Sequence, residues 1–173
     1  MNVIAFPELR QIYNYDCGCS ALCSILTYLG YDVREDALMA LAGTTPADGT
    51  PNSGILTVLT QYAVEYRPVK TVGDVQQALA NRHPVLLDLQ AWADQGPVDY
   101  ATDTVDGHYV IAIGASVLGR MICEDPSAYT RTWMTWDELE TRWHDIEGSQ
   151  PVRFGLEILS RGTYSPNDME HMD

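Results

Sequence analysis

The hydrophobic periodicity of this chain changes midway, and that change constrains the fold more than any other feature. In the first half, apolar residues recur at helical spacing over four segments, 17–29, 35–42, 55–63 and 74–81, with one short strand predicted at 64–69. Later apolar runs are typical of strands, at 85–89, 108–113, 120–123, 130–134 and 152–159, interrupted by one helix that ends near residue 143. Helices followed mainly by strands predict an α+β fold, in which an N-terminal helical half packs on an antiparallel sheet.

The length of 173 residues suits one domain with a hydrophobic core of its own. We expect a single domain over residues 1–161 and an acidic, flexible tail over residues 162–173. No apolar run approaches the roughly 18 residues of a membrane-spanning helix, and the first residues lack a basic leader followed by an apolar stretch. These features predict a cytoplasmic protein that does not bind membranes.

The charge is strongly negative, because 24 acidic residues face only 10 basic ones and the formal net charge is −14. Such a surface repels phosphate backbones and anionic lipids, so neither nucleic acid nor a membrane is an expected partner. Two interpretations of the charge remain open. It can serve solubility alone, or it can attract a basic substrate towards a site.

Four cysteines occur in the chain, at positions 17, 19, 23 and 123. Three of them fall within seven residues, unlike the dispersed cysteines of a disulfide framework. The spacing C-x-C-x3-C also differs from the usual ligand pairs of structural zinc sites. We therefore expect reduced thiols and no metal.

Cys17 is the thiol whose position favours chemistry, because it opens the first predicted helix. Unpaired backbone N–H groups at a helix N-terminus lower the pKa of a thiol and favour the reactive thiolate. Asp16 is the predicted helix cap, and Gly30 the residue that ends the helix. Gly18 follows the thiol directly and would let the backbone approach an incoming carbonyl group.

A nucleophilic thiol needs a base, a group that orients the base and a donor for the developing oxyanion. His108 begins a predicted strand after Gly107, and Asp125 follows the next strand. Neighbouring strands can bring these two side chains together although 17 positions separate them. Gln11 stands six residues before Cys17, so its amide and the Cys17 N–H could form an oxyanion hole.

Each of these residues also has a purely structural interpretation. Cys17 could be an inert buried thiol, since buried cysteines are common. His108 could be a strand-end histidine without a task, and Asp125 could simply start a turn before Pro126.

Four motifs occur in a fixed order along the chain: Gln11-x5-Cys17-Gly18, Tyr28-Leu29-Gly30, Gly107-His108-Tyr109-Val110-Ile111 and Glu124-Asp125-Pro126. This arrangement resembles the bacteriocin-processing, double-glycine leader peptidases, which are small members of the papain-like superfamily. The resemblance covers about residues 10–160. It implies a papain-like fold, with Cys17 as nucleophile, His108 as general base, Asp125 as the residue that orients the base, and Gln11 in the oxyanion hole.

The expected activity is hydrolysis of a peptide or small amide through a thioester on Cys17, without a cofactor or metal. Two alternatives share the fold. The acyl group could pass to an amine instead of water, or the domain could bind peptides without cutting them. The loops at 44–54 and 92–106 are expected to flank the cleft.

Overall fold

The computed structural model describes residues 2–94, 96–147 and 149–167 of the chain. Within those residues, an antiparallel sheet has the strand order β2-β9-β3-β4-β5-β6, and β1 pairs with β4 outside that order. The strands of this sheet are β1 (Asn2–Val3), β2 (Tyr66–Pro68), β3 (Val85–Gln90), β4 (Gly107–Ala115), β5 (Arg120–Glu124), β6 (Thr132–Thr135) and β9 (Phe154–Ile158). The predicted α+β class is confirmed.

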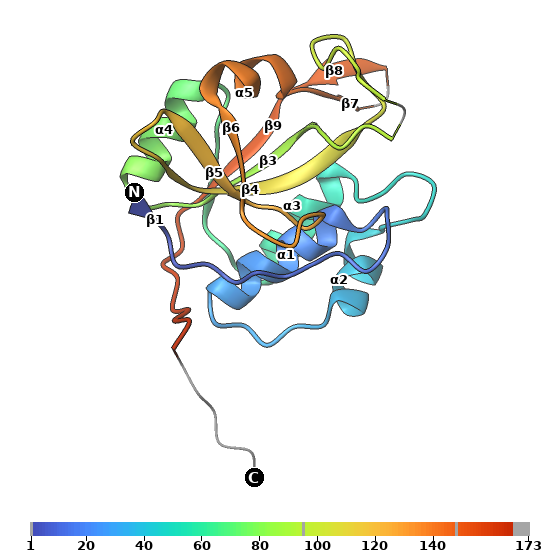
Figure 1. Ribbon diagram of the computed structural model, residues 1–173. Helices are drawn as coiled ribbons and strands as arrows, with labels where there is room; N and C mark the ends of the chain where they lie inside the picture. Colours follow the sequence, from blue (N-terminus) through green and yellow to red (C-terminus); the bar gives the residue numbers. More distant parts are fainter. Residues whose placement is uncertain (1, 95, 148, 168–173) are drawn as a thin grey trace.

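The helices cover both faces of the sheet (Figure 1). Three of them, α1 (Cys17–Tyr28), α2 (Glu35–Ala42) and α3 (Asn52–Gln61), form the predicted helical half on one face. The other two, α4 (Val72–Ala80) and α5 (Trp136–Arg142), pack on the opposite face. The molecule therefore has a second helical layer in addition to the predicted one.

Strand β3 explains why two hydrophobic cores meet at this sheet. All six of its residues are buried, since alternate side chains point to opposite faces and both faces are covered. Leu86 packs with the α1 core, whereas Leu87 packs with the α4 core. On the neighbouring strand, Ile111 and Val110 divide in the same way. Burial on both faces accounts for the nearly continuous apolar run of the β3 sequence.

The predicted last strand at 152–159 is wrong in its first residues, which belong to a separate hairpin. Strands β7 (Asp145–Glu147) and β8 (Gln150–Val152) pair with each other, and Val152 lies opposite Asp145. Strand β9 begins only at Phe154 and joins the main sheet. Arg153 lies between β8 and β9 and donates a hydrogen bond to the Trp143 carbonyl. This bond anchors the chain where it passes from the two-stranded hairpin to the main sheet.

The segment after residue 161 contacts α1. The backbone N–H groups of Thr163 and Tyr164 both donate to the Tyr28 carbonyl, at 2.9 and 3.1 Å. Residues 168–173 of the predicted flexible tail lie outside the described residues. No helix in the described part of the chain is long and apolar enough to span a membrane.

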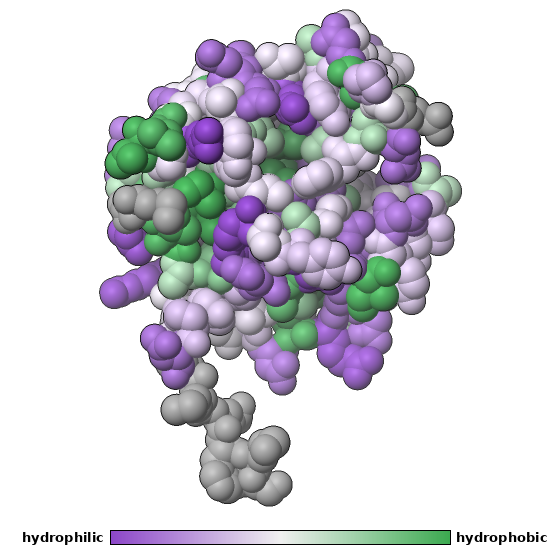
Figure 2. Space-filling view, viewed as in Figure 1, coloured by the Kyte–Doolittle hydropathy of each residue, from purple (hydrophilic) through white to green (hydrophobic). Residues whose placement is uncertain are grey.

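The turn between β4 and β5 exposes Val117 and Leu118 almost completely. On the face drawn in Figure 2, hydrophobic atoms gather near this turn and beside the N-terminal strand, while hydrophilic atoms cover much of the remainder.

Candidate active site

Cys17 is the first residue of α1 and its side chain is half-buried. Asp16 occupies the N-cap position, but the predicted cap is wrong, because its side chain makes no capping hydrogen bond. The buried Asp16 carboxylate instead accepts the backbone N–H groups of Ile12 and Tyr13. It therefore holds the loop before the helix in place and leaves the first turn of α1 uncapped at the thiol.

Gly18 is required by the packing of the helix start. A Cβ at this position would lie 2.6 Å from Cβ of Thr50 and 3.0 Å from Cδ2 of Tyr109. No real side chain tolerates such contacts. The close packing fixes the start of α1 against β4 and against the loop before α3.

His108 and Asp125 lie together, as predicted, because β4 and β5 are neighbouring strands. The distance from His108 Nε2 to Asp125 Oδ1 is 2.8 Å, and both residues are buried. The Asp125 carboxylate accepts three more hydrogen bonds, from Trp92 Nε1, the Thr132 hydroxyl and the Ser127 N–H. These donors fix the carboxylate in one orientation.

The titration of His108 depends on its contacts. Burial by itself would lower the pKa of His108, but its hydrogen bonds with Asp125 and Cys17 outweigh that effect and raise the pKa to about 9. Burial likewise opposes ionisation of Asp125, yet the hydrogen bond with His108 holds the pKa of that carboxyl below its usual range. At neutral pH the histidine is thus an imidazolium that faces Asp125 through Nε2, and the ring nitrogen left for Cys17 is Nδ1.

Gln11 is brought to the same region by buried ion pairs. Glu124, which is fully buried at the end of β5, binds Arg10 at 2.8 Å and also Arg131. The Gln11 N–H donates to the Pro126 carbonyl, and its side-chain oxygen accepts the Ser127 hydroxyl at 2.7 Å. Its side-chain nitrogen donates one hydrogen to the Tyr13 carbonyl at 2.7 Å. An amide nitrogen carries two hydrogens, so one donor remains.

The other three thiols differ from Cys17 in their surroundings. Burial raises the pKa of Cys19 and of Cys123, both of which lie inside the hydrophobic cores. Burial, together with the nearby Glu35 carboxyl, raises the pKa of Cys23 to about 11. Thiols of this kind are poor nucleophiles at neutral pH.

A cavity of about 370 Å³ adjoins the thiol. Its lining residues include Cys17, Asp48, Asp88, Tyr109 and Asp145. The loop at 44–54 contributes to this lining, as expected for a loop beside the cleft. In the other loop, at 92–106, the Trp92 side chain donates a hydrogen bond to Asp125, the partner of His108.

Sequence reasoning missed Trp92, Thr132 and Asp88. Trp92 has a positive φ of 60°, which is rare for this residue type and which turns the chain at the end of β3. No local pattern marks such a residue, because its partner Asp125 is 33 positions away. For Asp88 a signal existed, since it is a carboxylate inside the apolar run Val85-Leu86-Leu87-Asp88-Leu89.

The antiparallel sheet, the helix that begins with a cysteine and the adjoining His–Asp pair define the papain-like cysteine peptidase fold. The sequence matches the Peptidase_C39 like family over residues 3–151, and the chain belongs to that family. A search of curated protein sequences gives no match.

Solved structures support the fold. The peptidase domain of Streptococcus ComA, a bi-functional ABC transporter involved in quorum sensing, aligns with a TM-score of 0.64 at 18% identity, covering 86% of this chain and 93% of that domain. A structure described as a C39-like peptidase from Bacillus anthracis aligns with a TM-score of 0.66 at 14% identity, covering 94% of this chain and 100% of the other. A double glycine motif protease from an AMS/PCAT transporter, solved with its leader peptide, gives 0.64 at 13% identity, covering 91% and 94%.

Proposed function

We propose that this protein is a cysteine peptidase that hydrolyses a peptide or other amide bond through a thioester on Cys17. The observation that carries the proposal is the buried pair of His108 and Asp125, 2.8 Å apart, together with the effect of Cys17 in raising the pKa of His108. Family membership and the fold support the same class of enzyme. A neighbouring structure that holds its leader peptide supports a peptide as the ligand.

In the proposed mechanism, the Cys17 thiolate attacks the amide carbonyl carbon. The Cys17 N–H and the second hydrogen of the Gln11 amide nitrogen stabilise the oxyanion. His108 then donates its proton to the leaving amine as the C–N bond breaks, which leaves a thioester on Cys17. The neutral imidazole next removes a proton from water, which attacks the thioester and releases the acid and the thiol.

The pKa of His108 predicts a specific pH dependence. His108 keeps its proton below about pH 9, because its pKa is raised to about 9. As the pH rises through this value, His108 loses the proton that the leaving amine needs. Amide hydrolysis should therefore fall above about pH 9, whereas alkylation of Cys17, which needs only the thiolate, should not.

The test combines labelling with turnover. Alkylation of each cysteine by iodoacetamide is followed against pH by mass spectrometry, in the wild type, in His108→Ala and in His83→Ala as the matched histidine control. We expect fast labelling of Cys17 well below pH 8 that slows in His108→Ala alone. With an amide substrate from a peptide library, Cys17→Ala should reduce turnover by about 10⁴- to 10⁶-fold.

Other results would favour the alternatives. If Cys17 reacts no faster than Cys23, or does not respond to His108→Ala, the domain is better understood as a peptide-binding module. If added amines divert the acyl group into new amides, the enzyme is an acyltransferase.

A further inference from the structure

The cavity beside Cys17 is acidic. Asp48, Asp88 and Asp145 line it, and none of its lining residues, all in the described part of the chain, is Lys, Arg or His. The three carboxylates come from separate segments, namely the loop before α3, strand β3 and strand β7. Three separate parts of the chain therefore bring carboxylates to one cavity.

Asp88 is the most deeply buried of the three. It is 2% exposed, and its Oδ1 has no hydrogen-bond partner among the described residues. Burial, and then the charges of Asp145 and Cys17, raise the pKa of Asp88 well above its usual range. A buried carboxyl oxygen without a partner is costly, and such groups concentrate at functional sites.

Asp145 is held in position by the protein. Gln90 donates its side-chain N–H to Asp145 Oδ1 at 3.1 Å, and Gln90 itself is fully buried. Asp145 also packs so closely on Gly107 that a Cβ there would lie 2.7 Å from Asp145 Oδ2. The residue before His108 is thus a glycine because a carboxylate occupies the space that a side chain would need.

A metal ion does not fit this arrangement. Among the described residues, no group of three or more His, Cys, Asp or Glu side chains is placed to hold one. Carboxylates spread along a cavity suit an extended organic cation instead, because each wall can meet a different part of it. The volume of about 370 Å³ lies in the range of small-ligand sites.

We propose that this cavity receives the ammonium or guanidinium group of a basic side chain next to the scissile bond. The inference rests on the proposed function, since it takes the cavity to be the substrate-binding site of Cys17. Pro51, Tyr109 and Ile146 provide apolar surface for the alkyl part of such a side chain. The net charge of −14 adds a long-range attraction for basic peptides.

The first test needs no turnover. Cys17 is labelled with two methanethiosulfonates of similar size, one bearing a trimethylammonium group and the other a sulfonate, and each rate is divided by the rate with 2-mercaptoethanol. We expect a preference for the cationic reagent of about ten-fold or more, since opposite charges a few ångströms apart attract by more than a ten-fold change requires. In 1 M salt the Debye screening length falls to about 3 Å, so charges far from Cys17 no longer affect the reagents. A preference that persists at this salt concentration is therefore due to the charges of the cavity.

Two variants and one control locate the effect. Asp145→Asn should reduce the preference by about three- to ten-fold. Asp88→Asn should reduce it by less, because the raised pKa of Asp88 favours its neutral form. Glu65→Gln removes one exposed negative charge beside β2, near the end of the sheet away from Cys17, and should leave the preference unchanged. A preference that vanishes in 1 M salt, or that falls equally in Glu65→Gln, would overturn the proposal.

The second test uses substrates. Matched peptides carry either arginine or its neutral isostere citrulline on each side of the scissile bond, and kcat/KM is compared. We expect about a ten-fold or greater preference for arginine at one of these positions. If citrulline peptides are cleaved equally well, the cationic specificity is wrong while the peptidase activity stands. If Cys17 shows the charge preference but no amide is cleaved, the cavity proposal survives and the proposed function fails.

Discussion

Two buried carboxylates on neighbouring strands show how differently this protein treats its site and its scaffold. Glu157 on β9 is fully buried and lies between two partners, with Arg67 Nε at 2.9 Å and His83 Nδ1 at 2.7 Å. Asp88 on the adjacent β3 is 2% exposed, but its neighbours include Asp145 and Cys17. Glu157 thus has partners that favour its charged form, whereas the surroundings of Asp88 oppose its charged form.

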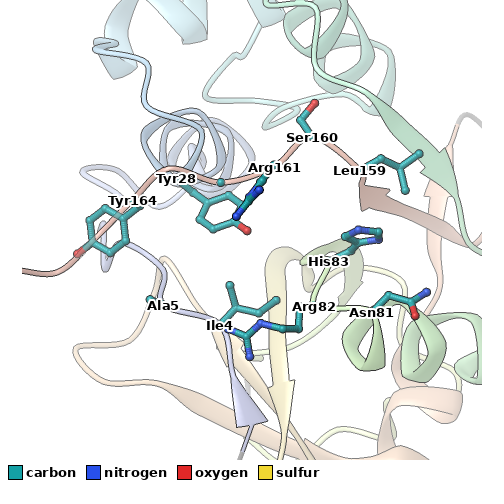
Figure 3. Close-up of a pocket in the computed structure, with 11 residues that line it drawn as sticks. Ile4, Ala5, Tyr28, Asn81, Arg82, His83, Leu159, Ser160, Arg161 and Tyr164 are labelled. Atoms are coloured by element: carbon teal, nitrogen blue, oxygen red, sulfur yellow. The ribbon is translucent and has the colours of Figure 1, made fainter.

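The cavities at the two ends of β3 differ in the same way. Beside His83, a cavity of about 460 Å³ is lined by Arg82, Arg161 and Tyr28, which come from separate segments (Figure 3). The cavity at Cys17 is lined by carboxylates. A buried charge stabilises a fold only when it is paired, whereas an unpaired one weakens the fold and is retained where it serves binding or catalysis.

The largest effect is expected from breaking the Glu157 pairs. The double variant Arg67→Ala/His83→Ala leaves a fully buried carboxylate without its two side-chain partners, and should lower the free energy of unfolding by about 3–5 kcal/mol at pH 7. Urea unfolding measures the change. Adding Glu157→Gln removes the stranded charge and should recover much of the loss. If adding Glu157→Gln recovers none of the lost free energy of unfolding, the contrast between Glu157 and Asp88 is wrong.

A smaller and opposite change is expected from Asp88→Asn, because Asp88 can relieve its unfavourable charge by binding a proton. Its raised pKa means that the folded protein holds this proton more tightly than the unfolded chain does. Asp88 therefore lowers stability as the pH rises from about 4 towards that raised pKa. The asparagine variant should be more stable than the wild type at pH 7 and equal to it below about pH 4.

Urea unfolding of both proteins across this pH range provides the measurement, with Glu65→Gln as the control for a lost surface charge. A variant that is less stable than the wild type at pH 7 would show that the folded structure stabilises the Asp88 carboxylate. The contrast with Glu157 would then disappear.

The smallest effect extends the comparison to the helices. Thr71 caps α4 in a reciprocal capping box with Asp74, whereas α1, which carries Cys17, has no side-chain cap. Thr71→Ala should lower the free energy of unfolding by about 1 kcal/mol. Thr71→Ser, which keeps the capping hydroxyl, should lower it much less. Thermal unfolding resolves the difference. A large loss of turnover in Thr71→Ala would contradict the assignment of this cap to the scaffold alone.

Local patterns were sufficient for most elements of the fold. The helical spacing of 35–42 matches α2 residue for residue, and the apolar run at 85–89 lies within β3. The β7–β8 hairpin was missed because its strands are only three residues each and carry no alternation long enough to recognise. The loss of Val152 from the last strand has the same cause.

The candidate site divides along a similar line. Cys17, His108, Asp125 and Gln11 could be proposed from the sequence because residue type, helix position and strand order restrict the choices. Trp92, Thr132 and the acidic cavity could not be proposed in this way, because no local sequence pattern marks them. Trp92 contacts Asp125 from 33 positions away and Thr132 contacts it from 7 positions away, while the cavity is lined by residues from several distant segments.

The sequence by itself determined the α+β class and the order of elements, because periodicity and turn residues act over short distances. It also placed a thiol at a helix N-terminus, a histidine on one strand and a carboxylate directly after the next strand. Only the tertiary structure decided that Asp16 anchors a loop instead of capping α1. It also decided that Glu157 is paired, and that one oxygen of the buried Asp88 carboxyl has no hydrogen-bond partner among the described residues. Those outcomes depend on which distant groups share a low-dielectric interior, where pairing governs the energy of a charge.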